Sequence, residues 1–237
     1  MAGLDIGSAL NYQFVNLINI TPFEATPTWS YLAEGIETIT PNPEEKVDET
    51  EDYSTGGNTR NTVTGVNMSY DFEGTRRIGN EAQEYIASLQ DDFGDARTTQ
   101  RRLVHPTGLI VEEDVTIRDI NMGGPNGEAS DKQAISFSMA RNDTPRIIQE
   151  AKGTKLPETI TVEAVTVAVD GTITVTPTVT PTTASNWCVY AIKDEEIAKV
   201  TADGIVTGLK AGETTLSVRC ASKPSVRATV KVTVTSE

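Results

Sequence analysis

Alternation of apolar and polar residues is the feature that most restricts how this chain can fold. In the last third of the sequence, an apolar residue takes every second position of several short runs. These runs are Val165, Val167 and Val169; Leu216, Val218 and Cys220; and Ala228, Val230, Val232 and Val234. A period of two places successive side chains on opposite faces of a strand. Residues 156–237 are therefore predicted to form an all-β sandwich, with a tight primed hairpin turn at Ala202-Asp203-Gly204.

The preceding residues combine such strands with one helix. Alternation predicts strands at 66–72, 115–117 and 135–139, with Gly65 marking a bulge before the first. After the first strand the spacing becomes helical, which predicts an amphipathic helix over about residues 80–91 with Asn80 as its N-cap and Gly94 beyond its end. The apolar stripe of this helix is Ile78, Ala82, Tyr85, Ile86 and Leu89. Residues 1–155 are expected to be an α+β domain with a dominant antiparallel sheet, and Gly123 to Gly127 a hairpin turn within it.

We place the domain boundary between residues 155 and 156, because the segment from Lys152 to Pro157 is polar and holds a glycine and a proline. Charge divides unequally there. Residues 1–155 hold 25 acids and 13 bases, a net charge of −12, and residues 156–237 hold 9 acids and 7 bases, a net charge of −2. The chain's net charge of −14 and its lack of Lys and Arg clusters argue against a sequence-reading DNA binder.

The first residues and the lengths of the apolar stretches indicate where the protein is made. No stretch approaches the roughly 20 apolar residues that span a bilayer, and the first residues do not form a Sec signal peptide. We therefore expect no membrane association and synthesis in a cytoplasm.

A long polar segment between Ile39 and Val63 does not match the alternation. Residues 41–58 hold almost no apolar side chain, so they are predicted to form a long loop. Two interpretations stay open: a solvated mobile loop, or a segment that becomes ordered against another copy through its charges, with a glycine pair as hinge. The residues concerned are Glu44, Glu45, Lys46, Asp48, Glu49, Glu51, Asp52, Gly56 and Gly57.

Residues able to carry out chemistry are sparse, so no enzyme, cofactor or metal site is expected. His105 is the only histidine and precedes Pro106 in a predicted turn, without a nucleophile motif around it. Acid clusters at 91–92 and 112–114 are more typical of solvated surface than of a Ca²⁺ site. Cys188 and Cys220 are either free buried thiols, which we favour, or a bridge between neighbouring strands.

The carboxyl-terminal domain resembles the bacterial immunoglobulin-like (Ig-like) domain of group 2. The resemblance is carried by Asn186-Trp187, Ile197 to Val200, Gly204 to Gly208 and Ala211 to Val218, and it makes Trp187 the anchor of the domain's core. Residues 60–150 resemble siphophage tail tube (major tail) proteins. The strand from Thr64 to Gly74, the helical segment from Asn80 to Leu89 and the strand from Ala134 to Met139 carry that resemblance.

The second resemblance implies a structural virion protein. It implies a mainly β chain: a tail tube domain (residues 1–155) built as an antiparallel sandwich or barrel with one flanking helix and a long loop, then the Ig-like sandwich (156–237). Such a protein stacks as rings, expected to be hexamers, into a tube whose acidic bore passes DNA without binding it. Tape-measure and tail-terminator or initiator proteins are its implied partners. The Ig-like domain is expected outside the tube, either as passive decoration or in weak contact with cell-surface glycans. An adhesin-type surface-binding module is the alternative function.

Overall fold

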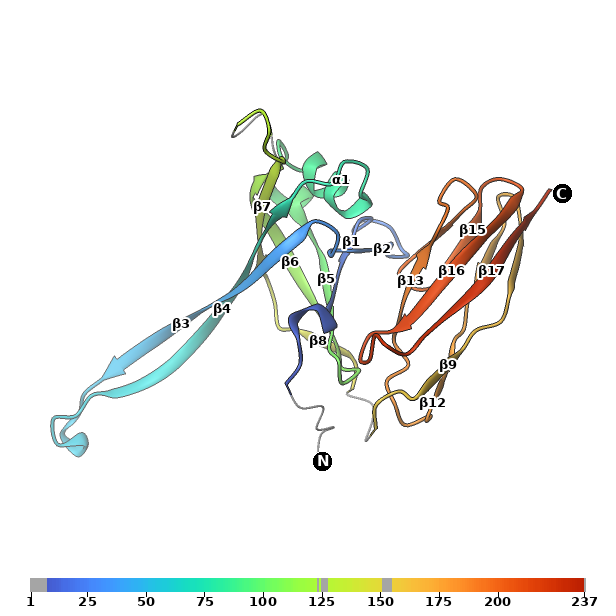
Figure 1. Cartoon of the computed structure of the whole chain (residues 1–237). Coiled ribbons are helices and arrows are strands. Elements are labelled where there is room, and N and C mark those ends of the chain that lie inside the picture. Colours follow the sequence, from blue (N-terminus) through green and yellow to red (C-terminus); the bar gives the residue numbers. More distant parts are fainter. Residues whose placement is uncertain (1–7, 123, 125–127, 151–154, 237) are drawn as a thin grey trace. The chain divides into compact units, whose positions relative to one another are not determined.

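The computed structural model describes residues 8–122, 124, 128–150 and 155–236. Its strands are β1 (Val15–Asn19), β2 (Trp29–Tyr31), β3 (Ile36–Thr50), β4 (Arg60–Thr75), β5 (Thr98–Val104), β6 (Ile110–Asn121), β7 (Ala134–Arg141), β8 (Arg146–Gln149), β9 (Thr159–Thr161), β10 (Val165–Ala168), β11 (Thr172–Thr174), β12 (Thr178–Thr180), β13 (Cys188–Ile192), β14 (Ala198–Val200), β15 (Ile205–Gly208), β16 (Gly212–Cys220) and β17 (Arg227–Thr235) (Figure 1). Helix α1 spans Glu81–Ser88, and single 3₁₀ turns are η1 (Asn11–Gln13), η2 (Tyr53–Thr55) and η3 (Gly94–Arg97). The predicted mainly β class is confirmed. No helix in the described part of the chain has the length and hydropathy needed to cross a bilayer.

Among these residues, eight strands form one sheet in the order β2-β1-β5-β6-β7-β4-β3, and β8 also pairs with β6. The chain divides into two compact units. The first holds Met1–Ala33, Gln100–Glu112 and Pro145–Glu237, and the second holds Glu34–Thr99 and Glu113–Thr144. Strand β6 contributes to both units. Each is described by itself below.

The core of the second unit is built on the predicted alternating strands. Phe72 of β4 lies opposite Phe137 of β7, and the two buried rings stack with centroids 4.8 Å apart. Val115, Ile117 and Met139 are fully buried in β6 and β7. The bulge predicted at Gly65 is also confirmed, because the register shifts there from the Lys46–Gly65 pair to the Val47–Val63 pair. The predicted turn at Gly123 to Gly127 falls mostly outside the described residues.

Helix α1 begins where the sequence predicts. The Asn80 side chain accepts a hydrogen bond from the Gln83 backbone N–H at 3.2 Å, which caps the first turn. Ala82, Ile86 and Leu89 are buried as expected. The assignment of Ile78 to the apolar stripe is wrong: Gly79 has a φ of +89°, so the chain turns before the helix and leaves Ile78 exposed.

The carboxyl-terminal part of the first unit is the predicted sandwich. Its strands pair in the orders β10-β17-β16-β13 and β11-β15-β14, with β9 and β12 as a separate pair. The core draws on both of these sheets, from Val165 in β10 and Val218 in β16 to Ala198 in β14 and Val206 in β15.

The turn between β14 and β15 differs from the predicted primed type. The Gly204 N–H donates to the Thr201 carbonyl at 3.0 Å, and Gly204 alone has a positive φ, of +81°. A turn that ends in one left-handed glycine suits the longer hairpin connection found here. The proposed linker residues 152–154 lie outside the described residues.

Candidate assembly surface and the contacts of the first unit

The segment predicted as a long loop is a long β-hairpin, so the loop prediction is wrong for most of its length. Residues 41–50 belong to β3 and pair antiparallel with β4 from Tyr70 back to Arg60. Proline and acidic residues argued against a strand, but β3 stands at the end of the sheet order, where proline and charge are tolerated. Only residues 51–59 connect the two strands.

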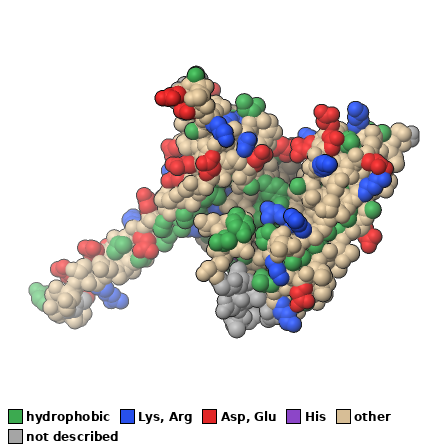
Figure 2. Space-filling model, viewed as in Figure 1, with side chains coloured by type: hydrophobic (Ala, Val, Ile, Leu, Met, Phe, Trp, Pro, Cys, Tyr) green, Lys and Arg blue, Asp and Glu red, His purple; other side chains and the backbone are tan. Residues whose placement is uncertain are grey.

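The distal part of the hairpin, residues 44–67, pairs with no third strand from the described part of the chain. Strand β7 pairs with β4 only from Ser69 to Thr75, so among the described residues the two strands pair only with each other beyond Ser69 (Figure 1). Both faces of this ribbon are exposed to solvent. Acidic and hydrophobic side chains follow one another along it (Figure 2). A two-stranded hairpin without a third layer is marginally stable in water.

Register assigns the exposed side chains of the distal hairpin to its two faces. Val47 lies opposite Val63 and Glu45 opposite Val66, which puts three half-exposed valines on one face. Glu44, Lys46 and Asp48 alternate onto the other face. Charges mark this segment in the sequence, and the valines are a signal that the loop prediction did not use, although Val47 and Val63 stand on either side of the glycine pair.

The structure brings the predicted site residues together along this ribbon. Glu44, Glu45, Lys46, Asp48 and Glu49 lie in β3, and Glu51, Asp52, Gly56 and Gly57 lie in the connection. Within the connection, Asp52 Oδ1 accepts from the Ser54 N–H at 2.7 Å and Glu51 Oε1 accepts from the Thr59 hydroxyl at 2.9 Å. Gly56 and Gly57 both have positive φ, of +63° and +86°, so the glycine pair makes the reversal of the chain.

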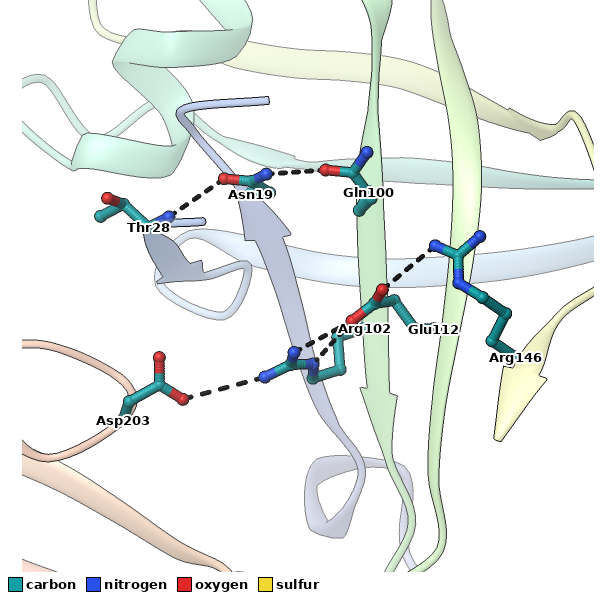
Figure 3. Close-up of polar contacts among 7 residues, drawn as sticks. All are labelled: Asn19, Thr28, Gln100, Arg102, Glu112, Arg146 and Asp203. Atoms are coloured by element: carbon teal, nitrogen blue, oxygen red, sulfur yellow. Dashed lines mark hydrogen bonds and ion pairs between the residues drawn. The ribbon is translucent and has the colours of Figure 1, made fainter. Parts of the chain in front are cut away.

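A second group of contacts lies within the first unit, around Arg102 of β5. Its guanidinium lies 2.9 Å from Glu112 Oε2 and 3.8 Å from Asp203 Oδ1, and Arg146 reaches the other Glu112 oxygen at 3.1 Å (Figure 3). The guanidinium carbon also lies 3.9 Å from the centre of the Trp29 ring. Burial raises the pKa of Asp203, and the charge of Arg102 partly opposes this.

Apolar contacts join the same residues of the first unit. Val15, Leu17, Trp29, Val104 and Ile110 form a buried cluster with Ala202 and Ala221, and Tyr31, Trp187 and Val189 pack against it. The Tyr31 hydroxyl donates to the Ala202 carbonyl and accepts from the Tyr190 N–H, each at 3.4 Å. Burial raises the pKa of Tyr31 to about 12, which keeps it protonated as a donor. The Ig-like residues therefore share a packed cluster with β1, β2 and β5.

Trp187 stands in this cluster, half-buried, and not among the buried residues of the sandwich core. Its indole Nε1 is buried without a hydrogen-bond partner. The core of the sandwich is filled by smaller side chains such as Val206 and Leu216. Residues from another part of the chain, Trp29 among them, belong to the cluster against which Trp187 packs, and sequence periodicity within the domain could not show this.

The groups considered for chemistry have structural roles. The His105 ring packs edge-on against Phe14 with centroids 5.3 Å apart, and burial lowers its pKa. Its carbonyl accepts from the Gly108 N–H, as the predicted turn requires. The prediction of solvated surface is wrong for Glu112 and Glu113, whose side chains are only 14% and 6% exposed. Glu112 pairs with arginines, and Glu113 accepts from the Tyr70 hydroxyl at 3.0 Å. Within the described ranges, no group of three or more His, Cys, Asp or Glu side chains could hold a metal ion.

Comparison with known families and structures assigns the carboxyl-terminal domain. Residues 157–237 match the model of the bacterial Ig-like domain (group 2), which confirms the predicted Ig-like domain. A comparison with curated proteins finds no match.

Solved structures of phage-like tails are similar to the chain at low sequence identity. A chain in the tail of an empty gene transfer agent particle, refined with C6 symmetry, is 12% identical with a TM-score of 0.48, over 60% of this chain and 100% of that one. A chain from the sheath/tube terminator structure of an extracellular contractile injection system is 10% identical with a TM-score of 0.39, over 60% and 98%. An intimin fragment structure is 12% identical with a TM-score of 0.28, over 84% and 63%. Likenesses with TM-scores below 0.5 carry no weight for function.

Proposed function

We propose that this chain is a structural protein that polymerises as stacked rings into the tail tube of a bacteriophage-like particle. The observation that carries the proposal is the distal hairpin, residues 44–67, which pairs with no third strand among the residues that the structure describes and exposes three valines on one face. The resemblance of residues 60–150 to siphophage tail tube proteins supports the same role. No catalytic function is proposed.

The distal hairpin suits contact between copies of the chain. Its valines are about half exposed, and covering the exposed half of each stabilises a contact by roughly 1 kcal/mol. A hairpin that inserts into a different surface of the next copy makes a heterologous contact, and repetition of such a contact gives rings or filaments. Pro41 and Pro43 lack N–H groups on β3, so a neighbouring strand cannot form a continuous hydrogen-bonded ladder along the β3 edge at the base of the distal hairpin. We therefore expect neighbours to meet the side-chain faces of the distal hairpin.

The distribution of charge fits a conduit for DNA. Residues 1–155 carry the net charge of −12, of which the segment 44–52 supplies six acids and one base. An acidic lining repels phosphates, so DNA passes without being held. In this proposal the rings are hexamers, DNA does not bind specifically, and tape-measure and terminator or initiator proteins contact the ends of the tube. The Ig-like domain lies outside the bore, and the assembled protein is part of a virion.

Electron microscopy and sedimentation of the full chain test the proposal. The wild-type protein at high concentration is expected to form six-fold rings or hollow tubes, more readily at higher salt, because salt screens repulsion between the acidic hairpins. A chain that stays monomeric at millimolar concentration at both low and high salt contradicts the proposal.

A shortened hairpin tests the element that carries it. Pro43 lies directly opposite Met68, so replacing residues 44–67 by Asn-Gly keeps the remaining register and closes it with a two-residue turn. The shortened chain should still unfold cooperatively when followed by circular dichroism and should form no stacked tubes. Tubes of normal length from this variant would contradict the role of the hairpin and leave the polymerisation proposal standing.

A further inference from the structure

Cys188 and Cys220 form a directly opposed pair in one sheet of the Ig-like domain. Cys188 is the first residue of β13 and Cys220 the last residue of β16, and the two are register partners. Both thiols are free and buried. Neither residue takes part in the proposed assembly surface.

The hydrogen bonds around the pair define its geometry. The Ala221 N–H donates to the Trp187 carbonyl at 3.1 Å, and the Cys220 N–H donates away from β13 to Val226 at 3.0 Å. Cys188 and Cys220 are therefore a non-hydrogen-bonded pair, in which the Cα atoms of an antiparallel ladder lie about 4.5 Å apart and the side chains approach most closely. Disulfides join Cα atoms about 4.4–6.8 Å apart, so the backbone already holds the two residues within bridging distance.

The position of the pair also gives an oxidant access. Within the described ranges, strand β13 is an edge strand of its sheet and pairs with β16 alone. The two cysteines lie where β13 begins and β16 ends. The ends of edge strands open more readily than the centre of a sheet. Both sulfurs are buried in the closed sheet, so we expect an oxidant to reach them only when this end opens.

We propose that Cys188 and Cys220 are a redox-active pair that closes into a cross-strand disulfide when the chain meets a small-molecule disulfide oxidant such as oxidised glutathione. The Cys220 thiolate attacks one sulfur of oxidised glutathione, whose S–S bond breaks, and one glutathione thiol leaves. The Cys188 thiolate then attacks the Cys220 sulfur of this mixed disulfide and expels the second glutathione as a thiol. Two cysteine thiols are oxidised, one glutathione disulfide is reduced, and the two cysteine protons end on the two glutathiones.

The order of attack follows from the hydrogen bond between the thiols. That hydrogen bond lowers the pKa of Cys220, although burial opposes the shift, and the same bond together with burial raises the pKa of Cys188. Cys220 is thus the thiol that ionises first, and a thiolate is the attacking form.

The disulfide would stabilise the neighbouring residues of the first unit. Trp187 precedes Cys188 and Ala221 follows Cys220, and both belong to or pack against the buried cluster with Trp29. Closing a loop of about 30 residues at this point prevents the strand end from fraying. The disulfide therefore stabilises the strand end that supplies the Ig-like residues of that cluster, whether or not the chain assembles.

Refolding of the full chain in a glutathione redox buffer tests the proposal, because refolding removes any barrier to access. The wild-type protein should lose the mass of two hydrogen atoms and give a peptide that links Cys188 to Cys220. The Cys188→Ser and Cys220→Ser variants should each gain one glutathione instead. In the control Cys188→Ser/Val189→Cys, the new thiol faces the opposite side of β13, since Val189 pairs with Arg219, and no internal bridge should form.

Hydrogen exchange supplies a second measurement on the wild-type protein. The Ala221 amide should exchange more slowly in the oxidised than in the reduced protein, by roughly tenfold or more, because its acceptor is the Trp187 carbonyl beside the bridge. Wild-type protein that ends with two bound glutathiones, or with thiols that still react with iodoacetamide after unfolding, overturns the proposal. An unchanged Ala221 exchange rate overturns the inferred effect on the strand end.

Discussion

Val47 lies directly opposite Val63 across the β3–β4 hairpin, and 45% and 52% of the two residues stay exposed. The pair stands beside the bulge at Gly65 and beyond the last residue of β4 that β7 covers. An exposed apolar cross-strand pair at this place contributes little to the folding stability of the isolated chain. We therefore expect its main effect to be on the free energy of association between copies.

Replacing both valines by threonine tests this expectation. Threonine keeps the β-branched shape and the strand propensity and adds a hydroxyl that is costly to cover. Val47→Thr/Val63→Thr should raise the concentration needed for assembly by about tenfold or more. Each substitution removes about 1 kcal/mol of binding free energy from a contact between copies, and the two losses add. Sedimentation velocity over a concentration series measures the change, and the melting temperature of the monomer should stay within a degree or two.

A matched substitution on the Ig-like domain serves as the control. Ile173 and Ile205 are exposed to a similar extent, at 39% and 37%, on β11 and β15. Ile173→Thr/Ile205→Thr should leave the assembly concentration unchanged. An equal loss of assembly in both double variants would mean that general surface hydrophobicity, and not the hairpin, drives association.

The strands and the helix that bury residues could be predicted from the sequence. Phe72, Ile117 and Phe137 alternate with polar residues because a sheet with one buried face requires a period of two. Asn80 marked the start of α1 because its side chain supplies the acceptor that the first helical turn lacks.

The hairpin could not be predicted in the same way. Residues 44–50 bury no face, so no alternation marks them as a strand, and the pairing with β4 is visible only in three dimensions. The position of Trp187 failed as a prediction for a related reason. The buried cluster that it packs against includes Trp29 and Leu17, which are distant in sequence, and a motif within one domain says nothing of contacts from outside it.

Removal of the Arg102 side chain should destabilise the first unit. Arg102→Ala leaves Glu112, whose side chain is only 14% exposed, with Arg146 as its remaining ionic partner and uncovers the Trp29 ring. We expect a loss of about 2 kcal/mol in the free energy of unfolding. Both tryptophans of the chain, Trp29 and Trp187, lie at the affected cluster, so their fluorescence during urea unfolding measures the change.

An exposed ion pair provides the comparison for Arg102. Lys231 pairs with Glu213, and both side chains are more than half exposed. Lys231→Ala should change the free energy of unfolding by less than about 0.5 kcal/mol. Arg102→Lys should fall between the two, since lysine keeps the charge and loses the planar contact with Trp29. A loss for Arg102→Ala no larger than for Lys231→Ala would contradict the structural role of Arg102.

Asp203 predicts a pH dependence of stability with a defined sign. Burial raises its pKa above the ordinary 3.8, so the ionised carboxylate is less favourable in the folded than in the unfolded chain. The stability that proton binding contributes is fully present below pH 3.8 and is lost as the pH rises through the folded pKa. Asp203→Asn resembles the protonated form at every pH. This variant should therefore be more stable than the wild type at pH 7, and the difference should disappear as the pH falls below 3.8.

Urea unfolding of both proteins between pH 3 and pH 7 measures this difference. A carbon NMR titration of the Asp203 carboxyl provides an independent check, with a midpoint expected above 3.8. A midpoint below that value would mean that attraction to Arg102, 3.8 Å away, outweighs burial. The variant would then be the less stable protein at pH 7.

Two glycines of β4 should respond in opposite ways to alanine. At Gly74 an added Cβ would lie 1.9 Å from the Gly35 carbonyl oxygen, a backbone atom that cannot move aside while Gly35 O accepts from the Thr75 N–H at 2.8 Å. At Gly65 the nearest atom to an added Cβ is Lys46 Cβ, at 3.8 Å, which is an ordinary contact. Neither glycine has a positive φ, so the comparison isolates steric fit from backbone strain.

Gly74→Ala should lower the free energy of unfolding by about 3 kcal/mol, whereas Gly65→Ala should raise it by about 0.5 kcal/mol, because alanine restricts the unfolded chain. Thermal unfolding followed by circular dichroism measures both, and equal melting temperatures for the two variants would contradict the close approach of β3 and β4 at the base of the hairpin.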